Sequence, residues 1–188
     1  ATFIEKAGIE PGHVIEFAGA LAERNSPFAC LRQTIARHLH AKGATSEAAA
    51  RVALAGWLGR TDSSAATLEH VKTMLALWRG QLLAGADGRN VVFAAAEALV
   101  ANQPAPVLLL LEDAHWIDPS TLELLERIIT TAGAGRLALI LTRLVAGRDW
   151  SRDVDTVIQL GRLAGDDCRE LIEAVAGCQV EAPLIRQI

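Results

Sequence analysis

An unbroken run of aliphatic residues near the middle of the chain constrains the fold most. Val107 to Leu111 shows no alternation of apolar and polar residues, which is typical of a strand buried on both faces of a parallel sheet. Two acids, Glu112 and Asp113, follow it directly. Ligands of open α/β sheets bind outside the carboxyl ends of the strands, so these acids can reach a bound metal ion or water. The sequence therefore predicts an α/β fold with a site at this edge.

The residues after the acids predict a helix. Asp118-Pro119-Ser120 combines a capping side chain with a proline that fits a first turn, and Ser120 with Glu123 matches a capping box. The apolar residues that recur at helical spacing are Leu122, Leu125 and Ile129. This spacing indicates a helix that buries one face.

A second aliphatic strand is predicted beyond this helix. Gly133 and Gly135 end the helix, and Leu137 to Leu141 is the next aliphatic run. Thr142 and Arg143 follow this run directly. The unit is therefore strand, helix, strand, with polar residues after both strands.

The segment L-L-L-L-E-D-A-H-W-I-D-P-S-T-L-E-L-L resembles the Walker B region of AAA-type and STAND P-loop NTPase domains. Such domains are attached to bacterial adenylate and guanylate cyclases and to large transcriptional regulators. The acidic pair, the His-Trp pair, Asp-Pro-Ser and the leucine-rich helix carry the resemblance. It implies a three-layer, P-loop NTPase-like parallel sheet and an ATP-binding regulatory module that uses Mg²⁺ within a larger signalling protein.

The resemblance also implies roles for individual residues. Glu112 takes the position that supports Mg²⁺, and Asp113 the position that orients or activates the attacking water. Thr142 and Arg143 take the place of a sensor for the γ-phosphate. The commoner AAA order is Asp then Glu, which is reversed here. The alternatives are a solvated or capping acid pair and a surface arginine at position 143.

Three further residues of the motif have simpler interpretations. His115 and Trp116 have no role that the residues themselves define, and a packed His beside a Trp is commoner than a catalytic one. We expect Asp118 to cap a helix rather than to bind phosphate.

The phosphate loop of the resembled family, G-x-x-x-x-G-K-[ST], does not occur in these 188 residues. Its backbone N–H groups wrap the phosphates, and its Lys and hydroxyl handle charge and Mg²⁺. In the family, a helix and a strand such as His13 to Phe17 come directly after this loop. We therefore expect the chain to begin inside that helix, at Thr2 to Ala7, as a fragment that by itself binds ATP poorly or not at all. ATP and Mg²⁺ are expected in the intact protein.

The predicted sheet has a vacancy where the strand before the phosphate loop would lie. The strands that the sequence supplies are His13 to Phe17, Val107 to Leu111, Leu137 to Leu141 and Thr156 to Leu160. We expect the first three to be neighbours, with Val107 to Leu111 in the centre. Thr156 to Leu160 is expected to stand apart across the gap, leaving edges prone to pairing.

The remaining chain predicts helices. One starts at Ser26-Pro27, one at Thr45-Ser46-Glu47, and one spans Asp87 to Ala101. The helix between the last two carries an apolar stripe of Leu68, Val71, Leu75, Trp78 and Leu82. These stripes and tryptophans are expected to be core, with an interface as the alternative. A last helix opens after Leu163 and stops at Gly177, with Leu171, Ile172 and Val175 as its apolar residues.

These elements predict two parts. Residues 1–160 form a partial AAA-type nucleotide-binding core with a helical insert over about 26–102. Residues 161–188 form the start of a helical lid.

Composition excludes several classes of protein. The chain is 51% hydrophobic and 21% charged with a net charge of −4, and its 18 basic residues are outnumbered by 22 acidic ones. It therefore predicts neither a nucleic-acid surface nor, without a long apolar run, a membrane span. The first residues do not resemble a signal peptide. Three cysteines without metal-ligand spacing indicate reduced thiols in the cytoplasm.

Two classes of function stay open. The first is an ATP-dependent regulatory domain whose partners are other domains of the same polypeptide. The second is a non-catalytic interaction module with an NTPase-like fold that does not bind nucleotide. A cysteine or serine hydrolase comes third, because Cys30 and His38 are related only by helical spacing and no G-x-S-x-G motif occurs.

Overall fold

A computed structural model of the 188-residue chain describes residues 13–59, 64–81, 85–103, 106–132, 137–144 and 155–177. The chain divides into two compact units, Ala1–Arg148 and Asp149–Ile188. The helix expected over Thr2 to Ala7 and the helix end expected at Gly133 and Gly135 lie outside the described residues. None of the described helices is long and apolar enough to cross a membrane.

The first unit is built on a parallel sheet of three described strands, β1 (Val14–Ala18), β2 (Val107–Glu112) and β3 (Leu137–Leu141). β2 lies in the centre, with Phe17 of β1 paired to Leu111 and Leu111 paired to Leu141 of β3. Three of the four predicted strands, their parallel direction and their order are confirmed, with boundaries that differ by at most one residue. The fold is therefore an α/β fold with a three-stranded parallel sheet and surrounding helices, consistent with a partial P-loop NTPase-like fold.

The predicted strand over Thr156 to Leu160 is wrong. This stretch has no strand pairing in the structure, and Val157, Ile158 and Leu160 are 69%, 80% and 88% exposed. Among the described residues, β3 pairs only with β2. A short stretch with apolar residues forms a strand only where it finds a pairing partner, and the pattern of Thr156 to Leu160 alone supplies none. The predicted gap between this stretch and β3 stays a prediction.

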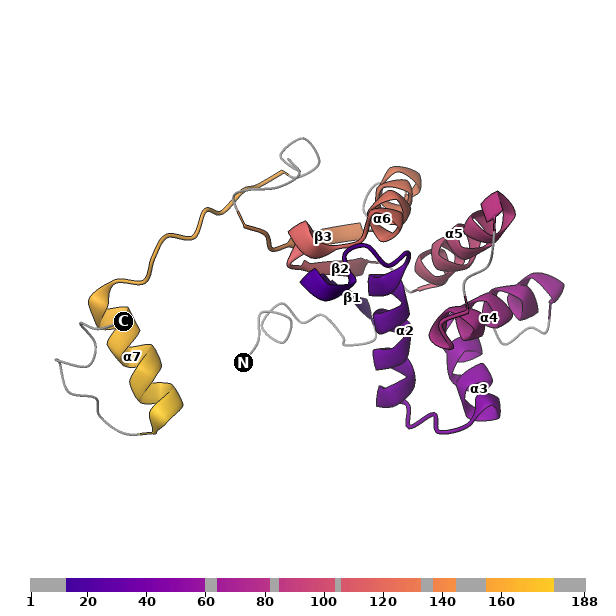
Figure 1. The fold of residues 1–188 in the computed structure, drawn as a ribbon, viewed down its shortest axis with the longest axis horizontal. Coiled ribbons are helices and arrows are strands. Elements are labelled where there is room, and N and C mark those ends of the chain that lie inside the picture. Colours follow the sequence, from indigo (N-terminus) through magenta and orange to yellow (C-terminus); the bar gives the residue numbers. More distant parts are fainter. Residues whose placement is uncertain are drawn as a thin grey trace. The chain divides into compact units, whose positions relative to one another are not determined.

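Helices connect the strands (Figure 1). Between β1 and β2 lie α2 (Ala29–Ala41), α3 (Glu47–Trp57), α4 (Ala65–Trp78) and α5 (Gly85–Asn102). Between β2 and β3 lies α6 (Pro119–Thr131). The predicted helices are confirmed, except that α2 starts at Ala29, after Phe28, and not at Ser26-Pro27. Ser46 caps α3 by accepting from the N–H of Ala49. Each neighbouring pair, α2 with α3, α3 with α4, and α4 with α5, is in contact.

The apolar stripe predicted on α4 is partly wrong. Val71 and Leu75 are buried, whereas Leu68 is 50% exposed, and Leu82 lies outside the described residues. Met74 and Leu77 are buried instead. Because α4 contacts α2, α3 and α5, its buried face is wider than one stripe and is centred away from Leu68.

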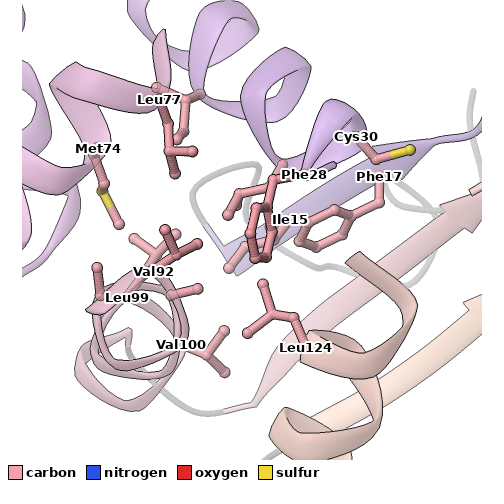
Figure 2. Packing of buried hydrophobic residues seen from close by; sticks show 14 of the residues in the cluster. Ile15, Phe17, Phe28, Cys30, Met74, Leu77, Val92, Leu99, Val100 and Leu124 are labelled. Carbon is pink, nitrogen blue, oxygen red and sulfur yellow. The ribbon is translucent and has the colours of Figure 1, made fainter. Parts of the chain in front are cut away.

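One face of the sheet packs on the helices and forms the core. Ile15 and Phe17 of β1 belong to one cluster of buried side chains that also includes residues of α2, α4, α5 and α6 (Figure 2). Alternate residues of β2 point into the same cluster, which also contains Val107, Leu109 and Leu111. On the opposite face of β2, Leu108 is buried and Leu110 is half-buried. This core fixes β2, and therefore the residues that follow it.

The second unit contains one described helix, α7 (Gly165–Ala176). It ends at Gly177, whose backbone is left-handed with φ of 67°, as the glycine predicted. Its apolar residues Leu171 and Val175 are exposed.

Candidate functional site

The acid pair lies at the carboxyl end of the central strand, and both side chains are exposed. Glu112 is the last residue of β2, and Asp113 begins the loop that leads to α6. We call residues 113–117 the acid loop; its middle is the 3-10 turn η3 (Ala114–Trp116). The backbone of Asp113 is left-handed, with φ and ψ both 48°, a conformation that Asp adopts more readily than most residues.

The end of β3 holds the first end of the acid loop through Thr142. The N–H of Asp113 donates to Thr142 Oγ1 over 3.1 Å, and the N–H of Ala114 donates to the Thr142 carbonyl over 2.8 Å. The N–H of Thr142 donates to the carbonyl of Leu111 over 2.8 Å. The structure thus joins two of the predicted site residues, Thr142 and Asp113. Arg143 follows Thr142 at the same strand end and is half-buried.

β1 ends against the acid loop at Gly19. Its N–H donates to the carbonyl of Glu112 over 2.8 Å. A Cβ at this position would lie 2.4 Å from the carbonyl oxygen of Asp113 and 2.9 Å from the nitrogen of Ile117. Only glycine therefore fits here without displacing the loop. Sequence reasoning does not identify Gly19, whose signal is a glycine directly after a predicted strand.

The far end of the acid loop meets Asp118, whose side chain is fully buried. Its Oδ1 accepts from the N–H of Phe28 and of Thr121, both over 2.9 Å. Its Oδ2 accepts from the N–H of Cys30 over 3.2 Å and from Thr121 Oγ1 over 2.7 Å. One carboxylate therefore binds the N-termini of both α2 and α6.

The predicted cap at Asp118 is confirmed, and the predicted capping box is wrong. Because Asp118 is the N-cap and Pro119 follows it at the first helical position, Ser120 lies inside the helix. Glu123 forms an ion pair with Arg89 instead. The bonds from Asp118 to α2 were not predicted, since they join residues about ninety positions apart.

His115 and Trp116 are half-buried and lie against each other. Their ring centroids are 4.7 Å apart with the planes tilted by 47°. The guanidinium of Arg24 lies over the Trp116 ring, 5.7 Å from its centroid, a cation–π arrangement. His115 Nδ1 accepts from the N–H of Leu144 over 3.4 Å. These contacts fit the expected packing role.

A cavity of about 540 Å³ lies elsewhere, between α4, α5 and α6. Its lining includes His70, Glu97 and Ile128. Neither acid of the pair lines it, so this cavity is separate from the carboxyl edge of the sheet.

A family model described as an AAA ATPase domain matches residues 2–141. This match spans the sheet, the acid pair and the helices from α2 to α6. The chain belongs to the AAA ATPase domain family. No curated protein and no solved structure matches the chain significantly. Membership makes it an NTPase-type domain, and the family implies the use of a nucleotide and Mg²⁺.

The donors at the carboxyl edge fit this AAA ATPase membership. Glu112 and Asp113 supply carboxylate oxygens, the ligands that Mg²⁺ prefers. In the part of the chain that the structure describes, no group of three or more His, Cys, Asp or Glu residues could hold a metal ion. An AAA ATPase does not need three protein ligands for its metal ion, because Mg²⁺ at nucleotide sites binds one or two carboxylates together with phosphate oxygens and water.

The geometry of α2 argues against a cysteine hydrolase in this AAA ATPase domain. Cys30 and His38 lie eight residues apart on α2, which is about 12 Å along a helix. His38 stacks on Trp57 with ring centroids 4.0 Å apart, and burial lowers the pKa of His38. Burial raises the pKa of the Cys30 thiol to about 11. The thiol is therefore protonated near neutral pH and is a poor nucleophile.

Proposed function

We propose that this chain forms part of the nucleotide-binding region of a regulatory ATPase, in which the acid pair serves Mg²⁺ and the attacking water. The observation that supports this most is the position of Asp113. It follows the central strand directly, and its backbone is bonded to Thr142 of the neighbouring strand over 3.1 Å. Both acid side chains are exposed at an edge where ligands of open α/β sheets bind.

The chemistry of ATP hydrolysis explains why two acids are useful there. The water oxygen attacks the γ-phosphorus while the bond to the bridging oxygen breaks, ADP leaves, and the water gives up a proton. In this proposal Asp113 orients the water and accepts its proton, and Glu112 supports Mg²⁺ as a Walker B acid does. Thr142 and Arg143 contact the γ-phosphate. Bound Mg²⁺ would neutralise charge that develops on the phosphate oxygens.

The proposal includes a phosphate loop that the 188 residues do not contain, since no G-x-x-x-x-G-K-[ST] occurs in them. We therefore propose that these residues alone bind no ATP and that the loop belongs to a longer, cytoplasmic signalling protein of the STAND type. Residues 1–160 would form its core, with the helical insert at about 26–102, and residues 161–188 the start of its lid. A cyclase or a transcriptional regulator is the proposed setting, and other domains of the same polypeptide are the proposed partners.

The lack of that motif also favours a second candidate. A chain that keeps the fold without a phosphate loop would act as an interaction module that binds no nucleotide. The two candidates differ in whether the complete gene product, with every residue that its gene encodes, binds Mg-ATP in calorimetry. Binding supports the ATPase, and its absence supports the interaction module.

The roles of the acids are tested by charge removal in the complete gene product. Asp113→Asn should keep ATP binding but slow hydrolysis by about 100-fold or more, because general-base contributions are of that order. Glu112→Gln should raise the Mg²⁺ concentration needed for half-maximal activity. Glu69→Gln, an exposed acid on α4, is the matched control and should change neither. If both variants hydrolyse ATP like the unmodified protein, the assignment of the acids is wrong.

A further inference from the structure

Asp118 is the most heavily bonded buried side chain near the acid pair. Its two oxygens accept four hydrogen bonds, from the backbone of Phe28, Cys30 and Thr121 and from the Thr121 hydroxyl. A carboxylate offers about four acceptor sites, so this one is fully used within the protein. It therefore has no capacity left for a phosphate or a metal ion, and its part in the site must be indirect.

The bonds from Asp118 to the start of α2 accompany an unusual backbone conformation at Phe28. Phe28, the residue before α2, has a left-handed backbone with φ of 56°. A bulky residue adopts this conformation only where surrounding bonds compensate for its cost. Here the N–H of Phe28 points at the Asp118 carboxylate, and the Phe28 side chain is buried in the core. A negative charge at two helix N-termini is also favoured by both helix dipoles.

The acid loop that joins Asp113 to Asp118 is short and internally bonded. The N–H of Trp116 donates to the carbonyl of Asp113 over 2.7 Å, and the N–H of Ile117 donates to the carbonyl of Ala114 over 3.4 Å. Asp113 itself is left-handed. A shift of Asp118 must therefore be absorbed within residues 113–117, next to the acid pair.

We propose that Asp118 is a positioning residue: it fixes the acid loop against the N-terminus of α2 and so sets the direction of Asp113. The inference rests on the proposed ATPase function. α2 is the first helix of the helical region that ends with α5, and it contacts β1, α3, α4 and α6. Asp118 thereby couples this helical region to the acid pair, so that a movement of α2 alters hydrolysis more than nucleotide binding.

Two variants separate this role from simple capping. Asp118→Ser keeps an oxygen that caps α6 but is too short to bind both N–H groups of α2. Thr121→Val removes one of the four bonds and leaves those to α2. In the 188-residue chain, the amide NMR signals of residues 112–116 should shift in Asp118→Ser and stay in place in Thr121→Val. Asp118→Asn, which keeps the shape, replaces Asp118→Ser if that variant does not fold. Unchanged signals for residues 112–116 in a folded Asp118 variant would overturn the inference.

Kinetics of the complete gene product then separate the inference from the proposed function. Asp118→Ser should lower kcat by up to about 100-fold, the cost of a misplaced reacting group, with the KM for ATP within about twofold of the unmodified value. Asp113→Asn is measured beside it. If Asp113→Asn is slow and Asp118→Ser keeps the unmodified kcat, the inference fails while the proposed function stands. If Asp113→Asn hydrolyses ATP normally, the proposed function is wrong, and the inference about Asp118, which rests on it, is wrong as well.

Discussion

The two ends of the acid loop are anchored by different means. At the first end, an exposed hydroxyl, that of Thr142, and one backbone carbonyl accept from the loop. At the far end, the fully buried carboxylate of Asp118 binds the N-termini of two helices. Bonds to a buried charge cost more to lose than an exposed neutral bond. The comparison teaches that the loop is held more firmly by α2 and α6 than by the neighbouring strand.

The largest expected effect is that of removing the buried anchor. Asp118→Ala should lower the free energy of unfolding by about 3 kcal/mol or more, because a helix cap is lost and buried N–H groups are left without an acceptor. Urea unfolding of the 188-residue chain measures it. Ser120→Ala, two residues after the cap, should change the free energy of unfolding by less than about 0.5 kcal/mol. Equal effects of the two substitutions would contradict the role of Asp118.

The contact between β1 and the acid loop should give an intermediate effect. Gly19→Ala places a Cβ 2.4 Å from the Asp113 carbonyl oxygen and should destabilise the fold by about 2 kcal/mol, as overpacking does. Gly56→Ala in α3 is the control, because a Cβ there meets nothing within 4 Å. It should stabilise the helix by up to about 1 kcal/mol. Thermal unfolding that ranks the two variants in the opposite order would show that the close approach at Gly19 is not restrictive.

The smallest effect is expected at the exposed anchor. Thr142→Val removes the hydroxyl that accepts from Asp113 and should lower stability by about 1 kcal/mol or less. Hydrogen exchange at the Asp113 amide should become faster, and Thr142→Ser, which restores the hydroxyl, should return it to the unmodified rate. A Val variant with the unmodified exchange rate would remove Thr142 from the anchors of the loop.

The fold was predictable where local pattern and tertiary contact agree. Val107 to Leu111 has a strand on each side and a packed core face, so its aliphatic pattern predicted the central strand. Thr156 to Leu160, with three apolar residues in five, was also predicted as a strand and forms none, because a pattern alone does not supply a pairing edge. The face of α4 was misplaced at Leu68 for a related reason, since its packing against several helices decides which residues are buried.

The part of the candidate site that depends on residues close together in the sequence was predictable. The acids after β2 and the cap at Asp118 follow from residue type and spacing. Gly19 and the bonds from Asp118 to Phe28 and Cys30 could not be predicted, because they depend on how distant segments meet. Nothing in a single sequence distinguishes an Asp that caps one helix from an Asp that caps two.

The central claim, that the acid pair serves the metal–nucleotide complex, is tested most directly by paramagnetic NMR of the complete gene product. Mn²⁺ takes the place of Mg²⁺ and broadens signals from nearby nuclei, and Mg-ATP is the diamagnetic control. Mn-ATP should broaden the amide signals of Glu112, Asp113 and Thr142 most strongly, and Glu112→Gln should weaken that broadening. Strongest broadening around the cavity residues His70 and Glu97, or none with saturating Mn-ATP, would contradict the account.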